Sequence, residues 1–182
     1  MISRIVLVLS LLSACAVVVT AQKWPDGKAP VIANADPYVA IPGAALSPTK
    51  TTTYSAVFDA TKFAKDPRSL VPAINAAGGL LNDLAVGGTP AKNTHFVVVF
   101  HGGATDGILT NENYRAKYGV DNPNLPAIAK MKQMGVEFYV CGQHLAGSNI
   151  DPATLTKDVT IAADAYLVLI GFQNKGYGVM FF

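Results

Sequence analysis

One cysteine, Cys141, stands where it could act as a nucleophile. It follows a predicted buried strand, residues 136–140, and precedes Gly142 and Gln143. The thiolate is the reactive form of cysteine, and a nearby histidine cation or a helix N-terminus stabilises it. Gly142 would let a substrate or a donor protein approach the backbone closely. The alternative is an inert core residue, because unpaired cysteine is among the most buried residue types.

A histidine, His101, follows an apolar run, residues 95–100. If both segments are parallel strands, their carboxyl ends share the edge of the sheet where ligands bind in open α/β folds. We therefore expect His101 and Cys141 to be the candidate catalytic residues. The alternative for His101 is a loop histidine whose ring bonds to backbone groups. The candidate ligand-binding residues beside the pair are Gly102, Gly103, Gly142 and Gln143.

Several other chemistries lack their motifs. The chain has no G-x-S-x-G nucleophile elbow, no P-loop and no G-x-G-x-x-G segment. No pair of histidines has the spacing of metal ligands, so we expect neither a metal nor a cofactor. The net charge is +2 and no run of Lys or Arg occurs, which argues against a nucleic-acid partner.

The elements that would position these residues alternate along the chain. Strands are predicted at 52–58, 95–100, 136–140, 165–170 and 177–181. Helices are predicted at 68–86 and 123–134, and helical turns at 151–159. The polar stretch between 101 and 122, with Asp106, Glu112 and Asp121, is expected to be a loop. This alternation predicts an α/β fold with a mostly parallel sheet.

Residues 1–21 have the pattern of a signal peptide. Arg4 supplies the positive charge, residues 5–19 are apolar, and small residues precede a cleavage site after Ala21. We expect a periplasmic or secreted protein without stable membrane insertion after cleavage. A lipobox-like tetrapeptide ending at Cys15 leaves lipid anchoring as an alternative. After ordinary cleavage, Cys141 is the single thiol of the mature chain.

The mature chain divides into an arm and one domain. Residues 22–50 contain five prolines and are predicted to be an extended arm lying on the domain or on a neighbouring subunit. Residues 51–182 form the α/β domain. Only 14% of the chain is charged, and it ends with Val-Met-Phe-Phe at 179–182. An apolar end of this kind predicts packing in an oligomer.

Three segments together resemble the DsrE/DsrF-like family. They are Val-Val-Val-Phe-His-Gly at 97–102, Met-Gly-Val-Glu-Phe-Tyr-Val-Cys-Gly-Gln at 134–143, and Leu-Val-Leu-Ile-Gly-Phe-Gln-Asn-Lys-Gly-Tyr-Gly at 167–178. The resemblance implies a three-layer α/β/α fold with a five-stranded sheet, and homotrimers or hexamers.

The resemblance also implies a chemistry. Some members relay sulfur on a cysteine that follows a central strand, and Cys141 is similar in position to that cysteine. The expected activity is then that of a sulfurtransferase-like carrier, which holds a persulfide and has a sulfur donor or acceptor protein as partner. The alternative is a non-catalytic oligomeric module that binds a small ligand or a partner, in which Cys141 is structural.

Overall fold

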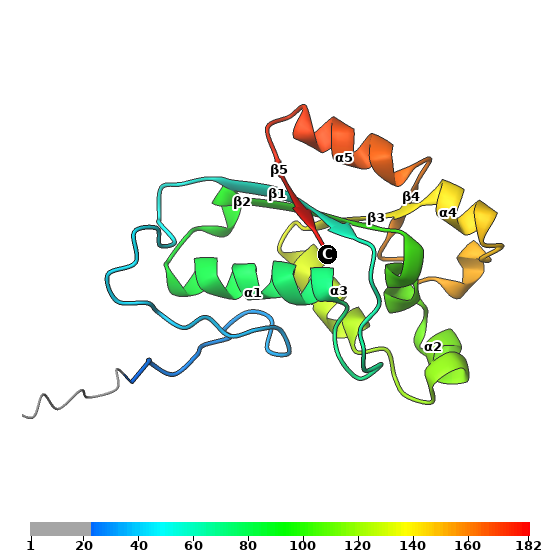
Figure 1. Ribbon diagram of the computed structural model, residues 1–182, viewed down its shortest axis with the longest axis horizontal. Coiled ribbons are helices and arrows are strands. Elements are labelled where there is room, and N and C mark those ends of the chain that lie inside the picture. The colour runs from blue at the N-terminus through cyan, green and yellow to red at the C-terminus, as the bar shows by residue number, and fades with distance from the viewer. Residues whose placement is uncertain (1–22) are drawn as a thin grey trace, which may run out of the picture.

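A five-stranded parallel sheet forms the centre of the computed structural model, which describes residues 23–182. The strands are β1 (Tyr54–Ala60), β2 (Thr94–Phe100), β3 (Glu137–Cys141), β4 (Thr160–Ala162) and β5 (Gly178–Phe181). Their order across the sheet is β4-β3-β2-β1-β5, and every neighbouring pair is parallel. Figure 1 shows this arrangement. The predicted α/β fold with a five-stranded, parallel sheet is confirmed.

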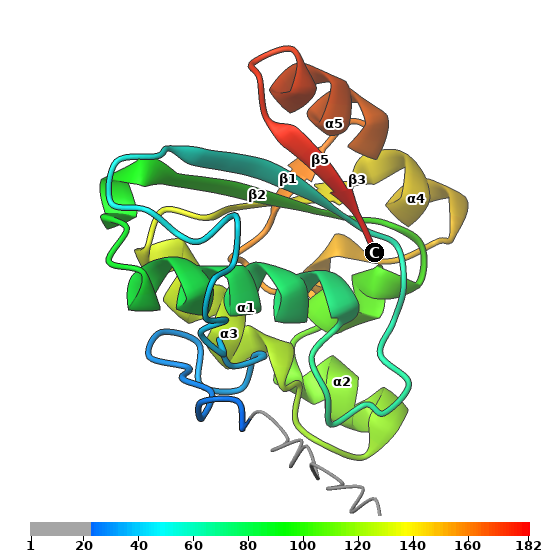
Figure 2. The same cartoon turned by 60° about the vertical axis from the view of Figure 1, so that its left-hand side comes forward.

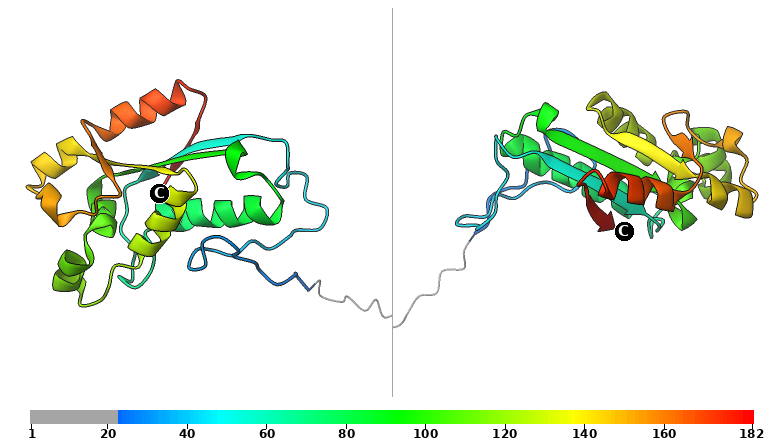
Figure 3. Two further views of the ribbon diagram at one scale, coloured as in Figure 1. Left: turned by 180° about the vertical axis from the view of Figure 1, so that it is seen from behind. Right: turned by 90° about the horizontal axis from the view of Figure 1, so that it is seen from above.

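Helices cover both faces of the sheet, as Figures 1 and 2 show. Two helices, α1 (Pro72–Val86) and α3 (Asn124–Gln133), lie together on one face. On the other face, α5 (Ala165–Gln173) contacts all five strands, and the view from above in Figure 3 shows it crossing the sheet. The remaining helices are α2 (Asn111–Tyr118), α4 (Gly142–Gly147) and three short 3-10 helices at Ala91–Asn93, Gly102–Ile108 and Pro152–Thr154.

The central strand β2 shows why a buried strand appears in the sequence as a continuous apolar run. Phe96, Val98 and Phe100 face the large core under α1 and α3. Val97 and Val99 face the smaller core under α5. A strand that is buried on both faces has no polar side to alternate with, so its sequence is continuously apolar.

Several expectations about secondary structure are wrong. Residues 165–170 form the start of helix α5, not a strand, and the edge strand is the short β4 instead. The Asp164 side chain caps α5 by accepting a hydrogen bond from the Tyr166 N–H at 2.9 Å. An apolar run of this length does not distinguish a strand from a packed helix.

The expected loop between 101 and 122 is largely helical. It contains the 3-10 helix Gly102–Ile108 and then α2. Thr110 caps α2 by accepting from the Asn113 N–H, and Gly119 ends it in the left-handed region at φ 74°. The first helix also begins at Pro72 rather than at 68, and residues 151–159 contain only one 3-10 turn.

The segment before β1 is held against α1 by one buried amide. Asn82, fully buried on α1, accepts hydrogen bonds from the backbone N–H groups of Val31 and Ile32, both at 3.0 Å. Its side-chain nitrogen donates to the carbonyls of Ile32 and Asp36. A Cβ atom on Gly78 would lie 2.7 Å from the Ala35 side chain. The segment therefore packs as part of the core, and Figure 2 shows it passing beside α1.

The predicted signal segment, residues 1–21, lies outside the described residues, and so does Cys15. Within residues 23–182, no helix has the length and apolar character needed to cross a membrane.

Replacing Asn82 with Ala should lower the free energy of unfolding by about 3 kcal/mol. The change leaves two backbone N–H groups without their acceptor, and a buried unsatisfied donor costs about 1–3 kcal/mol. Urea denaturation measures the effect. Asn93→Ala is the control, because Asn93 makes one exposed bond to the Lys50 carbonyl, and it should change stability by less than about 0.5 kcal/mol. Equal losses for the two variants would contradict the role of Asn82.

Candidate functional site

Cys141 ends strand β3, the neighbour of the central strand β2, and is the N-cap of α4. Its sulfur accepts a hydrogen bond from the backbone N–H of His144 at 3.4 Å. The residue is 5% exposed and packs on the α5 side of the sheet with Val97, Val99 and Leu169. The Cys141 sulfur therefore lies at the junction of β3 and α4, where it caps the first turn of the helix.

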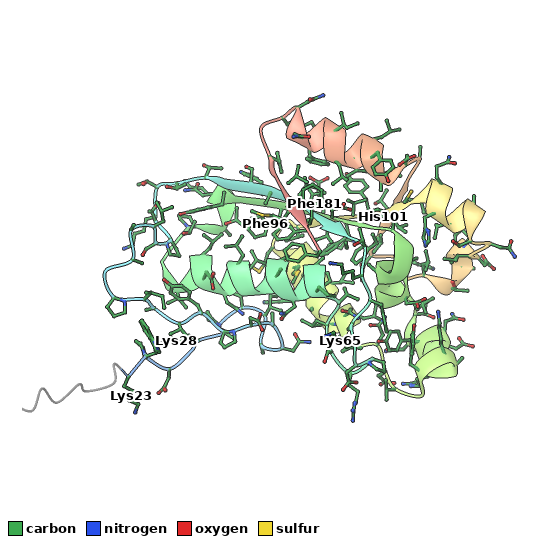
Figure 4. The ribbon with its side chains drawn as sticks, viewed as in Figure 1. Lys23, Lys28, Lys65, Phe96, His101 and Phe181 are labelled. Carbon is green, nitrogen blue, oxygen red and sulfur yellow. The ribbon has the colours of Figure 1, made fainter. Side chains whose placement is uncertain are left out.

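His101 follows β2 and is paired with a carboxylate. Its Nε2 lies 2.6 Å from Oδ1 of Asp59, on β1. The side chains are 21% and 9% exposed. A carboxylate accepts only, so Nε2–H donates to Asp59 and Nδ1 is left as the other ring nitrogen. The ring also meets the Tyr166 ring edge-on, with centroids 6.2 Å apart. Figure 4 shows His101 beneath α5.

The sheet register brings the two candidate catalytic residues to the same edge. Phe100 pairs with Val140, and His101 and Cys141 are each one residue further along. Both lie on the face that α5 covers, as their contacts with Tyr166 and Leu169 show. Their hydrogen-bond partners differ, because His101 bonds to Asp59 and Cys141 accepts from the His144 N–H.

The glycines that were expected to line a ligand site lie against the chain's own backbone. A Cβ atom on Gly142 would lie 2.8 Å from the Ala162 carbonyl oxygen. Gly102, at φ 56°, and Gly103 lie against the backbone of Thr61 and Phe63. In these places the missing side chain permits close packing of loops around the strand ends.

Gln143 occupies the exposed start of α4. Its backbone N–H donates to the Ala163 carbonyl at 3.2 Å, and its side chain faces solvent. This bond fixes the beginning of α4 beside the loop that leads from β4 to α5. Gln143 therefore helps to hold Cys141 at the helix start through its backbone.

A groove opens beside the His101–Asp59 pair. It has a volume of about 610 Å³ and lies between α5 and the edge strand β5. Its lining combines one carboxylate with mostly apolar side chains, namely Asp59, Tyr166, Leu169, Ile170, Gln173, Tyr177, Val179 and Phe181. A pocket of this size and character can hold a small molecule.

Tyr139, on the same face of the sheet, has a raised pKa. The Tyr139 hydroxyl donates to Glu137 at 2.7 Å. This bond and desolvation raise the pKa of Tyr139 to about 12. Tyr139 therefore stays a neutral hydrogen-bond donor through the physiological range. Among residues 23–182, no group of three or more His, Cys, Asp and Glu side chains is arranged to hold a metal ion.

Within residues 23–182, these features define an α/β fold with one buried thiol and a histidine–carboxylate pair near the carboxyl ends of adjacent strands. Residues 73–182, more than half of the chain, match the model of the DsrE/DsrF-like family, and the chain belongs to this family.

A solved structure with a similar fold is that of MTH1491, a protein of unknown function from Methanobacterium thermoautotrophicum. The TM-score is 0.52 and the sequence identity is 16%, over 70% of this chain and 98% of that chain. At this identity the likeness concerns the fold. A comparison with curated proteins gives no match.

Sequence reasoning missed Asp59 and Tyr166. Asp59 is an acidic residue near the end of an otherwise apolar, buried strand, and that mismatch was the available signal. Tyr166 was missed because its segment was interpreted as a strand, which gave no reason to place it over His101.

The Asp59 contact should fix the tautomer of His101. Nitrogen NMR of the imidazole should show the Nε2-protonated form, and Asp59→Ala should release the ring into a mixture of both neutral tautomers. His95 sits exposed at the start of β2, so its signals should not change. A dominant Nδ1-protonated tautomer of His101 in the unsubstituted protein would contradict the assigned contact.

Proposed function

We propose that this DsrE-family protein carries sulfur as a persulfide on Cys141. The observation that carries the proposal is the hydrogen bond from the His144 N–H to the Cys141 sulfur at the start of α4. This bond holds the Cys141 sulfur at the carboxyl end of β3, the edge at which open α/β sheets bind their ligands. Family membership adds support, because some members relay sulfur in this way.

The proposed step is a transfer between sulfur atoms. The Cys141 thiolate attacks the outer sulfur of a donor persulfide, R–S–SH, and forms the Cys141 persulfide. The S–S bond of the donor breaks, and the donor leaves as the thiolate R–S⁻. No external oxidant is needed, because the oxidised sulfur atom moves from one thiol to the other.

The His101–Asp59 pair would serve this step as a positioning and proton-handling unit. Asp59 holds the imidazole by its Nε2–H and leaves Nδ1 for proton exchange at the strand edge. Because Cys141 is 5% exposed, we propose that the loop from β4 to α5 moves when the donor arrives.

The burial of Cys141 favours a second candidate function, which is the binding of a small ligand. If Cys141 is a core residue, the groove of about 610 Å³ between α5 and β5 becomes the functional feature. Its lone carboxylate, Asp59, and its tyrosines would orient a small ligand. The protein would then act as a binding module.

We also propose export to the periplasm or beyond the cell, on the strength of the residues 1–21 pattern. A mature chain beginning at Gln22 would leave Cys141 as its one thiol. In an oxidising compartment, a thiol held as a persulfide or in a mixed disulfide is expected to be the resting form.

Treatment of the mature protein with a low-molecular-weight persulfide should add one sulfur atom, which a reductant removes. Intact-mass analysis measures both the mass gained from the added sulfur and the mass of the mature chain, which identifies its N-terminus. Cys141→Ser should gain nothing. His101→Gln should slow the addition roughly tenfold or more, because it removes the proton-handling ring, whereas His95→Gln should not change the rate.

Two results separate the candidate functions. If Cys141 gains no sulfur and resists alkylation until denaturant is added, sulfur carriage is wrong and the binding module remains. If sulfur is added but His101→Gln reacts at the unsubstituted rate, the role given to the His101–Asp59 pair is wrong.

Self-association is a further part of the proposal, as a homotrimer or a hexamer. The solvent side of α5 exposes Tyr166, Leu167 and Ile170, and the exposed Phe181 of β5 continues this apolar surface. Contiguous apolar patches on a soluble protein mark contact surfaces. The edge strand β5 adds unpaired backbone groups beside them.

Replacing Leu167 with Lys should dissociate the oligomer, because it places a charge in the apolar contact. Light scattering at micromolar concentration measures the mass. Leu46→Lys is the matched control: Leu46 lies on the arm and is 93% exposed, so this variant should keep the oligomer mass. A monomer mass for the unsubstituted protein would contradict self-association.

A further inference from the structure

A second cavity lies on the opposite side of the molecule, between the arm and α1. Its volume is about 440 Å³, which is within the range of small-molecule sites. Its walls are mostly apolar and combine residues of the arm with one face of α1; they are Tyr38, Ile41, Ala44, Leu46, Ser47, Pro48, Thr49, Thr52, Tyr54, Leu80, Asp83 and Leu84. Most of this lining precedes residue 73, where the family match begins.

The arm spans this cavity as an arch fixed at both ends. Upstream, Tyr38 forms a β-bridge with Lys28. Downstream, the Thr89 hydroxyl donates to the Thr49 carbonyl at 2.6 Å, and the Thr49 N–H donates to the Tyr54 hydroxyl. Pro48 packs on Gly87, where a Cβ atom would lie 2.3 Å away.

Between these fixed points the arch is shaped by one turn. The Ala44 N–H donates to the Ile41 carbonyl at 3.2 Å, with Pro42 and Gly43 between them. Gly43 has φ 73°, and proline followed by glycine at positive φ is the pattern of a type II turn. The turn sets the path that the arch takes over the cavity.

One charged group, Asp83, lines the cavity. No Lys or Arg is among the lining residues, and the described part of the chain offers Asp83 no hydrogen-bond or ion-pair partner. Desolvation raises its pKa, which shows that its surroundings disfavour the charged form. A carboxylate beside apolar walls is stabilised when a cation pairs with it.

We propose that this cavity binds small hydrophobic amines, with the ammonium group on Asp83 and the apolar body between α1 and the arch. Leu80 lies one turn before Asp83 on α1, Leu84 lies one turn after Leu80, and both line the cavity and would contact the apolar body. The tyrosine rings of the lining, Tyr38 and Tyr54, suit a cation as well. An anionic ligand would be repelled by Asp83, and a neutral one would leave it unpaired.

The test uses three probes of one shape: phenylbutylamine, phenylbutanol and phenylbutyrate. Titration of the purified protein, followed by amide NMR shifts, gives affinity and location together. The amine should bind at least about tenfold tighter than the alcohol, because a hydrogen bond to a charged group is worth about that factor. Phenylbutyrate should bind more weakly than both. The shifts should map to residues 38–54 and 80–84.

Two variants and one control test the role of charge. Asp83→Asn should remove the preference for the amine over the alcohol. Asp26→Asn makes the same charge change at an exposed position outside the cavity and should keep the preference. Leu46→Lys places a competing cation at the rim of the cavity, at a side chain that is 93% exposed. This variant should weaken binding of the amine more than binding of the alcohol.

Several outcomes would overturn the proposal. They are equal affinities for amine and alcohol, a preference that survives Asp83→Asn, shifts that map away from the cavity, or no saturable binding of either probe. Concentration-dependent shifts of these residues without any ligand would assign the cavity to a second copy of the chain instead.

Discussion

Parallel pairing of three adjacent strands is the constraint on which the candidate site depends. Parallel strands end at one edge, so residues far apart in the sequence meet there without any contact between their loops. Asp59 of β1 and His101, which follows β2, meet in this way, and Cys141 at the end of β3 lies at the same edge of the sheet. The register decides which side chains share a face, and a shift of one residue would turn a side chain to the opposite core.

Four of the five strands and two of these three residues could be predicted from the sequence, for a physical reason. A strand covered by helices on both faces is largely apolar, so β2 is visible as a run, and β3 is visible apart from its exposed Glu137. The ends of these segments mark the edge of the sheet. That is where His101 and Cys141 stand. Asp59 lies inside its strand, paired with a residue 42 positions away, and no local pattern predicts such a pair.

The helix α5 shows where local patterns fail. Its nine residues contain no charged side chain, and both its buried and its exposed positions are apolar. Without a polar side there is no helical period to detect. The Asp164 cap was the available local sign, yet acidic residues are also common before strands. The apolar side chains on the solvent side of α5 that hide its helical period are the same ones that form the exposed patch of the proposed self-association.

The position of β5 has a consequence for how the molecule assembles. β5 is synthesised after every other strand, yet it pairs with β1, the first strand, and the Thr61 N–H donates to the Phe182 carbonyl across 121 positions of sequence. Until β5 docks, the strand that carries Asp59 is an open sheet edge. Contacts of such high sequence separation form slowly, because loop closure costs entropy before pairing is gained. The strand that carries Asp59 is therefore completed late in folding. A nascent or truncated chain that lacks β5 would expose the unpaired backbone groups of β1, which can pair with other chains.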